Sequence, residues 1–400
     1  MSLPTRATTD RRAAIVVLDG VGAGEAPDAA AYGDVGSDTL ANTSRAVGGF
    51  DLPALESLGL GRIKPIDGLS ASREPAGAWG IMEPRSAGKD STTGHWEIAG
   101  LHLARPFPTY PHGFPRDLID EFAQRTGRSV IGNGVGSGTA IIDTFGAEHM
   151  RCGAWIVYTS ADSVFQIAAH EAVVPLDELY AACDVARMLL VEPHNVSRVI
   201  ARPFVGEVGS FKRTYNRRDY SMPPPRDTVL DRVKSAGLPV VGVGKIEDIF
   251  AARGVTESVH TEGNRDGMRA TIDVASKLEK GFVFVNLVDF DMLYGHRRDA
   301  RGYRRALEEF DRDYVELEKQ LRDDDLVLIS ADHGNDPTKH ETTDHTREYV
   351  PILAAGKRVK SGVNLGTRES FADIGATVEE ALGLAPVGPG RSFLSQISRG

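Results

Sequence analysis

The sequence of 400 residues has little cysteine, no long apolar run and no excess of positive charge. Cys152 and Cys183 are too few for a disulfide framework and form no Cys-x-x-Cys pair, so we expect a reducing compartment, the cytoplasm. No run reaches the roughly 18 to 20 apolar residues of a membrane span, and the first residues lack the apolar stretch of an export signal. The formal net charge of −10 disfavours nucleic-acid and membrane binding, which demand clustered Lys and Arg. The spare carboxylates could instead hold cations.

Short apolar runs rich in Val and Ile alternate with helix-like segments along the chain. Five such runs are typical of buried strands: 13–20, 154–163, 238–245, 282–291 and 325–334. Segments 227–237 and 304–323 carry apolar residues at intervals of three and four, which predicts helices. The alternation predicts an α/β fold with a mainly parallel sheet flanked by helices.

The length and the hydrophobic content of 41% favour two domains over one. The composition changes near 104–115, and the Pro-rich, charged stretch 217–227 is typical of a linker or hinge. We therefore interpret 103–221 as a smaller α/β domain inserted into a core domain made of 1–102 and 222–400.

Acidic residues follow three of the predicted strands. Asp19 ends the first run, Asp289 and Asp291 end the run 282–291, and Asp332 follows "LVLISA". Because ligands bind outside the carboxyl ends of strands in open α/β sheets, we expect these acids to converge. Several carboxylates in one cleft repel one another, so either their pKa values rise or metal ions neutralise them.

Histidines near these acids favour metal ions. His296 lies five residues after Asp291, His333 is next to Asp332, and His345 follows twelve residues later. Mixed imidazole and carboxylate ligands suit Zn, Mn or Fe, and two sets of three would bind two ions. Two ions about 3.5 to 4 Å apart can clamp both the attacking and the leaving oxygen of a phosphoryl transfer. A hydroxyl from the stretch 86–100, "SAGKDSTTGHWEIAG", would then be the nucleophile.

Each of these features also has a structural interpretation. A lone strand-end Asp is usually a cap or turn residue, a single His is usually a hydrogen-bonding group, and the Ser/Thr cluster by itself suits a helix N-cap. Isolated Lys and Arg side chains, such as Lys89, Arg297 and Arg298, are usually solvated. The four acid and histidine motifs, all at predicted strand ends, together favour the metal site.

Long motifs carry a resemblance that runs nearly from end to end. They are "VVLDGVGAGEAPDA", "GKDSTTGHWEIAG", "YTSADSVFQIAAHE", "RVIARPFVGE", "GSFKRTYNRRDY", "VGVGKIEDIF", "VNLVDFDMLYGHRRD", "SADHGND" and "TDHTREYVPIL". In this order they resemble the phosphopentomutases of the alkaline phosphatase superfamily, which are related to the cofactor-independent phosphoglycerate mutases. The resemblance implies an alkaline-phosphatase-like core, an inserted cap domain and two Mn²⁺ ions. It also implies the interconversion of α-ribose 1-phosphate and ribose 5-phosphate, or of the 2-deoxyribose pair.

The resemblance further implies a role for individual residues. One ion would be held by Asp19, Asp332 and His333, and the other by Asp291, His296 and His345, with Asp289 behind the ligands. The spacing between His333 and His345 is one residue longer than in some members, but the intact "DHTREYVP" favours His345 over His340 as the ligand.

The nucleophile departs from the family pattern. The phosphorylated Thr of the family falls on Ser91 here, with Thr92 as the alternative, and Lys89 would offset charge on the transferring oxygens. Asp162 would bind sugar hydroxyls, and Arg198, Arg213 and Lys245 would hold the phosphate that does not react. Without the resemblance, solvation would be the simpler interpretation of both arginines.

The expected mechanism passes through a phosphoserine and a 1,5-bisphosphate, with a cap that excludes water. Ribose 1,5-bisphosphate, or a similar sugar bisphosphate, would then act as an activator, and the physiological setting would be nucleoside salvage. The competing hypotheses are a metal-dependent phosphatase, a phosphoglycerate mutase and a metal-binding protein without activity. The sequence "TSADSVFQIAAHE" favours the pentose-specific cap over the first two, and the complete ligand set disfavours the third.

Overall fold

The computed structural model describes residues 11–72, 74–160 and 162–399. The chain divides into two compact units, of which the smaller, Phe107–Pro223, is inserted between Pro106 and Pro224 of the larger. The sequence placed these two boundaries at 102/103 and 221/222. The roles of the larger unit as catalytic core and of the smaller unit as cap stay predictions.

The larger unit is built on a mostly parallel sheet, whose described strands have the order β10-β9-β11-β1-β12-β13-β2-β14. Their bounds are β1 Arg12–Leu18, β2 Ala78–Met82, β9 Val240–Val243, β10 Glu257–Val259, β11 Gly281–Leu287, β12 Leu326–Ser330, β13 Val350–Ala355 and β14 Val363–Arg368. Among these strands, β13 alone runs antiparallel to its neighbours. The central strands are buried along their length because helices cover both faces of the sheet, which is why their sequences are continuously apolar. The expected mainly parallel α/β core is confirmed.

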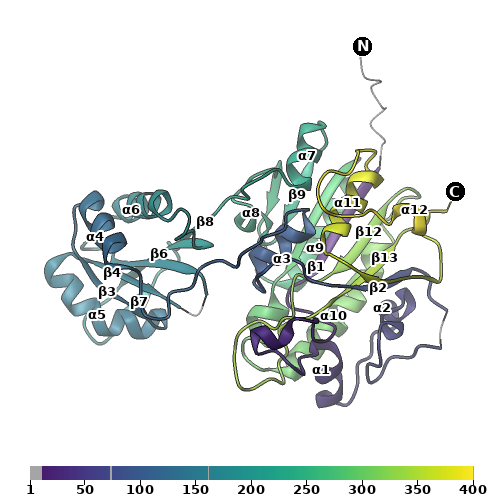
Figure 1. Ribbon diagram of the computed structural model, residues 1–400, viewed down its shortest axis with the longest axis horizontal. Helices are drawn as coiled ribbons and strands as arrows, with labels where there is room; N and C mark the ends of the chain where they lie inside the picture. The colour runs from purple at the N-terminus through teal and green to yellow at the C-terminus, as the bar shows by residue number, and fades with distance from the viewer. Residues whose placement is uncertain (1–10, 73, 161, 400) are drawn as a thin grey trace, which may run out of the picture. The chain divides into compact units, whose positions relative to one another are not determined.

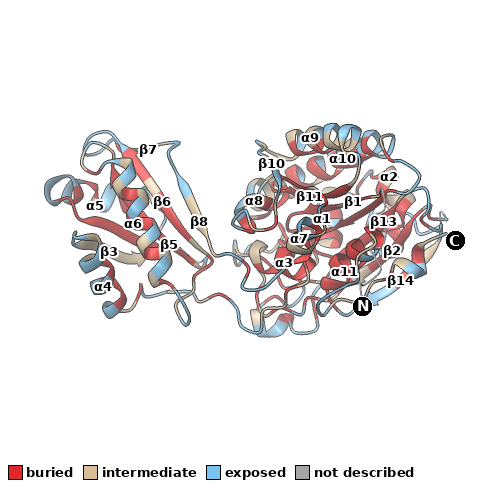
Figure 2. Ribbon diagram, turned by 90° about the horizontal axis from the view of Figure 1, so that it is seen from above, coloured by how far each residue is buried: buried red, intermediate tan, exposed pale blue. Residues whose placement is uncertain are grey.

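Helices cover both faces of this sheet. Figure 2 shows α9 and α10 on one side of it and α3, α7 and α11 on the other. The helices of the larger unit are η1 Ala29–Tyr32, α1 Thr39–Val47, α2 Pro53–Leu58, η2 Leu60–Arg62, α3 Ser91–Ile98, α7 Val229–Ser235, α8 Ile246–Ile249, α9 Asn264–Lys277, the π-helical turn η3 Phe290–Gly295, α10 Ala300–Glu318, α11 Ala372–Ala381 and α12 Leu394–Ile397. Within the described residues, no helix is both long enough and apolar enough to cross a bilayer.

The smaller unit is a second α/β layer structure (Figure 1). Its described strands have the order β3-β4-β5-β6-β7, and β8 also pairs with β6. The bounds are α4 Arg116–Thr126, β3 Val130–Val135, α5 Gly138–Cys152, β4 Trp155–Thr159, β5 Val164–His170, α6 Leu176–Leu189, β6 Arg198–Val205, β7 Lys212–Arg213 and β8 Arg218–Ser221. Apolar clusters fill both faces of the sheet, one under α4 and α6 and one under α5.

One sequence expectation needs correction in this unit. The stretch 217–227 was expected to be a linker, but its first part forms β8, which pairs antiparallel with β6 between Arg198 and Ala201. The prolines that suggested a linker come only after this strand, at 223–225. β8 is polar and at most partly buried along its length, as edge strands often are, and the Pro-rich composition obscured it.

The packing of the central sheet predicts the effect of a truncated core side chain. Leu328, in the middle of β12, is fully buried between β1 and β13. We expect Leu328→Ala to lower the free energy of unfolding by about 3 kcal/mol, because it removes buried methyl groups and leaves a cavity. Val387→Ala, at a position 59% exposed, should change it by less than about 0.5 kcal/mol. Urea unfolding followed by circular dichroism would measure both, and equal losses would contradict this account of the core.

Candidate metal centre

The carboxyl ends of three adjacent strands position the acidic residues. β1 lies between β11 and β12, with Leu18 opposite Leu287 and Val17 opposite Ser330. Asp19 follows β1 directly, and its N–H donates to the carbonyl of Leu287, which extends the pairing by one residue. Asp291 lies in the turn η3 after β11, and Asp332 lies two residues beyond β12. Residues separated by more than 300 positions in the sequence therefore meet at one edge of the sheet.

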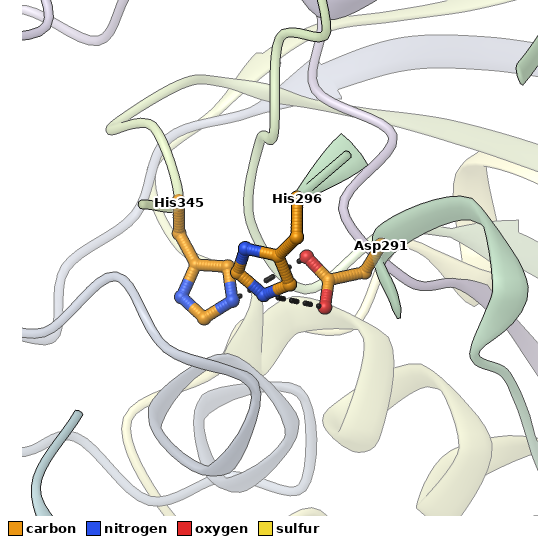
Figure 3. Close-up of side chains that lie close together, drawn as sticks. All are labelled: Asp291, His296 and His345. Carbon is orange, nitrogen blue, oxygen red and sulfur yellow. Dashed lines mark ion pairs between the residues drawn. The ribbon is translucent and has the colours of Figure 1, made fainter. Parts of the chain in front are cut away.

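Asp291, His296 and His345 form one group of possible metal ligands (Figure 3). Asp291 Oδ2 lies 3.1 Å from His296 Nε2, and Asp291 Oδ1 lies 3.4 Å from His345 Nε2. The two imidazole rings have centroids 4.8 Å apart. Burial disfavours a charged carboxylate here, but the two histidines outweigh burial and hold the pKa of Asp291 well below its usual range.

Asp19, Asp291 and His333 form a second group of possible ligands. His333 Nε2 lies 3.4 Å from Asp19 Oδ1 and 3.3 Å from Asp332 Oδ2. Burial opposes a charged imidazole, but the surrounding carboxylates, Asp332 first, raise the pKa of His333 well above its usual value. Asp291 belongs to both groups, so the two groups are contiguous.

The donor set fits divalent transition-metal ions. Its atoms are imidazole nitrogens and carboxylate oxygens, the ligands that suit Zn, Mn and Fe. Asp332 Oδ2 is buried and accepts no hydrogen bond of normal geometry, although His95 Nδ1 lies 3.1 Å and His333 Nε2 3.3 Å away. A buried carboxylate oxygen without a donor is costly, and a cation would satisfy it.

The hydroxyl of Ser91 lies at the edge of these groups. Its Oγ is 3.4 Å from Asp19 Oδ1 and 3.2 Å from His333 Nε2. Ser91 is the first residue of α3, while the N-cap is Asp90, whose side chain accepts from the Thr93 N–H. The cap interpretation of the Ser/Thr cluster therefore applies to Asp90 and leaves the Ser91 hydroxyl directed at the acidic centre. Gly94 allows this approach of α3, because a Cβ there would overlap the carbonyl of Asp332.

The other predicted residues of the larger unit belong to neither ligand group, although Lys89 lines a small cavity together with Asp332 and His333. The Lys89 ammonium is paired with Asp34 Oδ2 at 2.9 Å and with Asp344 Oδ2 at 3.2 Å. Lys245 is exposed and lies just beyond β9, at the start of α8. Asp289, expected behind the metal ligands, accepts a hydrogen bond from the N–H of Asn264 at 2.7 Å and thereby binds the start of α9.

The three predicted residues of the smaller unit lie at different places in it. Asp162 is exposed in the turn between β4 and β5. Arg198, at the start of β6, lies 3.4 Å from Asp219. Arg213 lines a cavity of about 540 Å³ together with Arg202 and other residues from β6, β7 and α5.

Several polar residues around the centre escaped the sequence analysis. Asn286 Nδ2 donates to Asp19 Oδ2 at 2.7 Å and lies 3.2 Å from His95 Nε2. Asn335 Nδ2 donates a hydrogen bond to Asp291 Oδ1 at 2.6 Å, and the side-chain oxygen of Asn335 accepts one from the Arg298 guanidinium. Asn286 gave a usable signal, since a lone amide inside the apolar run "FVFVNLV" has to find a buried partner. Asn335 gave none that separates it from an ordinary turn residue.

Glu348 is a buried carboxylate beside the metal centre. It accepts hydrogen bonds from the N–H groups of Gly24 and Thr39 and from the hydroxyls of Thr39 and Thr346. Burial outweighs these bonds and raises the pKa of Glu348 to about 7. The side chain thus connects the loop at Gly24, the start of α1 and the segment of Thr346, close to the candidate ligands.

Comparisons with known proteins agree with a metal-dependent enzyme. Residues 11–386 match the family model of the Metalloenzyme superfamily. The sequence is 57% identical to a phosphopentomutase of Carboxydothermus hydrogenoformans, over 97% of this chain and 100% of that protein. It is 56% identical to a phosphopentomutase of Clostridium novyi, over 96% of this chain and 98% of that protein. Among solved structures, a phosphoglycerate mutase of Leishmania mexicana shares 14% identity over 97% of this chain and 98% of its own, with a TM-score of 0.48.

Glu348 makes the stability of the fold depend on pH. A carboxyl whose pKa is about 7 in the folded state and near 4.5 when unfolded binds its proton more tightly in the folded state. For this group, stability is therefore highest below pH 4.5, falls as the pH rises through 7 and levels off above that. Relative to Glu348→Gln, the wild-type free energy of unfolding should fall by about 2 to 3 kcal/mol between pH 5 and pH 8. Parallel pH profiles of the two proteins in urea unfolding would contradict this.

Proposed function

The chain belongs to the phosphopentomutase family of the Metalloenzyme superfamily and is an isomerase; from this premise we propose that it interconverts α-D-ribose 1-phosphate and D-ribose 5-phosphate, and the 2-deoxyribose pair, through a phosphorylated Ser91. The observation that carries the proposal is the position of the Ser91 hydroxyl, within 3.4 Å of both Asp19 and His333. A nucleophilic hydroxyl has to be within such a distance of the groups that activate it.

Metal dependence follows from the superfamily and from the ligand geometry. We propose two Mn²⁺ ions, one held by Asp19, Asp332 and His333 and the other by Asp291, His296 and His345. Bound there, such ions would neutralise charge on the transferring phosphoryl group. Two three-residue groups of possible ligands, one around His296 and His345 and one around His333, support a pair of ions over one; the second group contains Asp291 where the proposal has Asp332.

The reaction transfers one phosphoryl group out and another back. The P–O bond of phosphorylated Ser91 breaks while the free hydroxyl of the pentose monophosphate forms a new P–O bond, and the hydroxyl proton is returned to the Ser91 oxygen. The resulting 1,5-bisphosphate then turns, so that Ser91 takes up the other phosphoryl group and the isomeric monophosphate leaves. Lys89, two residues before Ser91, adds positive charge to this edge of the sheet.

The part of the substrate that does not react needs its own binding groups. We propose that Arg198, Arg213 and Lys245 bind the second phosphate and that Asp162 accepts hydrogen bonds from sugar hydroxyls. The planar guanidinium group suits phosphate because it donates two parallel hydrogen bonds. The basic cavity that Arg213 lines supports its part of this assignment; Arg198, Lys245 and Asp162 do not line that cavity. The smaller unit would act as the cap that keeps water from the phosphoserine.

The bisphosphate intermediate has a kinetic consequence. If it escapes before the second transfer, Ser91 is left without its phosphoryl group, so added ribose 1,5-bisphosphate should activate the enzyme. The substrates are small pentose phosphates, and the place of the reaction in metabolism would be nucleoside salvage in the cytoplasm. A phosphatase would instead release inorganic phosphate steadily from the same serine.

The nucleophile can be identified by mass spectrometry. After incubation with Mn²⁺ and ribose 1,5-bisphosphate, we expect one phosphate on Ser91 and mutase activity that rises with its occupancy. Ser91→Ala should lower kcat by more than about a thousandfold, because the covalent route is lost. Ser91→Thr should keep a phosphorylated residue, and Thr92→Ala serves as the matched control. Phosphate on Thr92 would move the nucleophile by one residue, and steady phosphate release without a phosphoenzyme would identify a phosphatase.

The metal assignment can be tested with two neighbouring aspartates. Asp291→Asn removes a charge from both ligand groups, whereas Asp289→Asn changes a side chain that binds Asn264. We expect the first variant to lose Mn²⁺ affinity by at least about tenfold per site and the second to keep two ions per chain. Equilibrium dialysis with elemental analysis would measure both. Equal metal content in the two variants would refute the role of Asp291.

A further inference from the structure

The loop 84–88, just before the nucleophile helix, has most of its backbone carbonyls bound by two side chains. Arg347 donates to the carbonyls of Ser86 and Gly88 at 2.7 Å and of Pro84 at 3.1 Å. The Tyr32 hydroxyl donates to the carbonyl of Ala87 at 2.7 Å. Loops that carry functional residues are usually positioned by a rigid scaffold, and here side chains distant in the sequence supply it.

Arg347 is itself held rigidly. It is only 3% exposed, its guanidinium pairs with both carboxylate oxygens of Asp28 at 3.0 Å, and it lies 4.9 Å over the Tyr32 ring. The backbone N–H of Arg347 donates a hydrogen bond to Asp34 Oδ2, the carboxylate oxygen that also accepts from Lys89. The contacts with Asp28 and Tyr32 fix the orientation of the planar guanidinium with respect to the loop, and the contact with Asp34 fixes the backbone that carries it.

The opposite side of the loop is held by a second buried charge. Glu97, in α3, accepts hydrogen bonds from the N–H of Arg85 and of Ser86, and also from Ser370 and Phe371. The loop is thus bound through its carbonyls by Arg347 and Tyr32 and through its N–H groups by α3. Lys89 and Asp90 are then the last residues before Ser91, so little freedom remains between the clamp and the nucleophile.

We infer that Arg347, assisted by Tyr32, is a positioning residue that fixes the Ser91 hydroxyl against the metal centre; this rests on the proposed function. Arg347 lies two residues after His345, so the same short segment carries a ligand and the clamp. A displacement of about 1 Å at a reacting atom can cost about a hundredfold in rate. A clamp on the loop therefore contributes to the chemical step without touching the substrate.

The chain contains a matched control for this arginine. Arg12 is 5% exposed and, like Arg347, pairs with one carboxylate, Asp325, and donates to three backbone carbonyls, those of Ala275, Leu278 and Gln320. It lies at the start of β1, however, at the other end of the strand from Asp19. The two residues therefore have the same kind of structural role in different places.

The experiment compares Arg347→Lys with Arg12→Lys. Lys keeps the charge but cannot reproduce the planar fork, so both variants lose hydrogen bonds to backbone carbonyls. Both should lower Tm, measured by calorimetry. Only Arg347→Lys should slow the single-turnover phosphorylation of Ser91 by ribose 1,5-bisphosphate, by about tenfold to a hundredfold. It should lower kcat while leaving the KM for ribose 5-phosphate and the Mn²⁺ content near those of the wild type.

Tyr32→Phe keeps the test decisive if Arg347→Lys does not fold. It removes the single hydrogen bond to Ala87, and we expect phosphorylation to slow by about threefold to tenfold with the fold intact. Wild-type phosphorylation rates in Arg347→Lys and Tyr32→Phe, or equal slowing in Arg347→Lys and Arg12→Lys, would overturn the inference alone. A wild-type enzyme that takes up no phosphate would overturn the proposed function and the inference together.

Discussion

Repulsion among carboxylates at the ends of three neighbouring strands is the constraint on which the site depends. Asp19, Asp291 and Asp332 are all nearly or fully buried, and the topology of a parallel sheet brings them together. Three buried negative charges could not coexist without compensation. The structure supplies imidazoles within 3.4 Å of all three, and the two histidines beside Asp291 hold the pKa of that carboxyl well below its usual range. The same surplus of negative charge is what gives a divalent cation its affinity.

The position of α3 follows from this constraint. The proposed nucleophile needs a base or a metal ion close by to activate it, and the Ser91 hydroxyl lies within 3.4 Å of Asp19 and His333. Gly94 permits α3 to approach the end of β12, and Asp90 satisfies the helix start, so that Ser91 does not have to. Ordering the preceding loop costs conformational entropy. The buried charges Arg347 and Glu97 offset this cost, because both form hydrogen bonds with backbone groups of the loop. Buried charges of this kind are tolerated because all their hydrogen bonds are made.

The sequence predicted the parts of the fold that depend on local pattern. Continuous apolar runs identified β1, β9, β11 and β12, since strands covered on both faces have no polar side. The apolar runs did not predict where each strand ends. The run 282–291 was expected to be one strand, but β11 ends at Leu287, because Asp289 binds the start of α9 and the chain then enters η3. The antiparallel strand β13 could not be derived either, because direction is fixed by pairing with β12 and β2 and leaves no local trace.

The ligands and the clamp differ in how far a sequence can reveal them. The strand-end acids and nearby histidines could be proposed as a set because a general rule of α/β sheets brings strand ends together. No such rule predicts the position of Arg347. Its partners, Asp28 and the loop 84–88, are separated from it by about 260 to 320 positions, and each looks like an ordinary turn or surface residue in the sequence. Contacts that long side chains make between loops depend on how the helices and strands pack in the folded chain. They can therefore be recognised in the structure but not in the sequence. A site inferred from motifs alone will therefore include the proposed metal ligands and omit side chains such as Arg347, which bind a loop far away in the sequence.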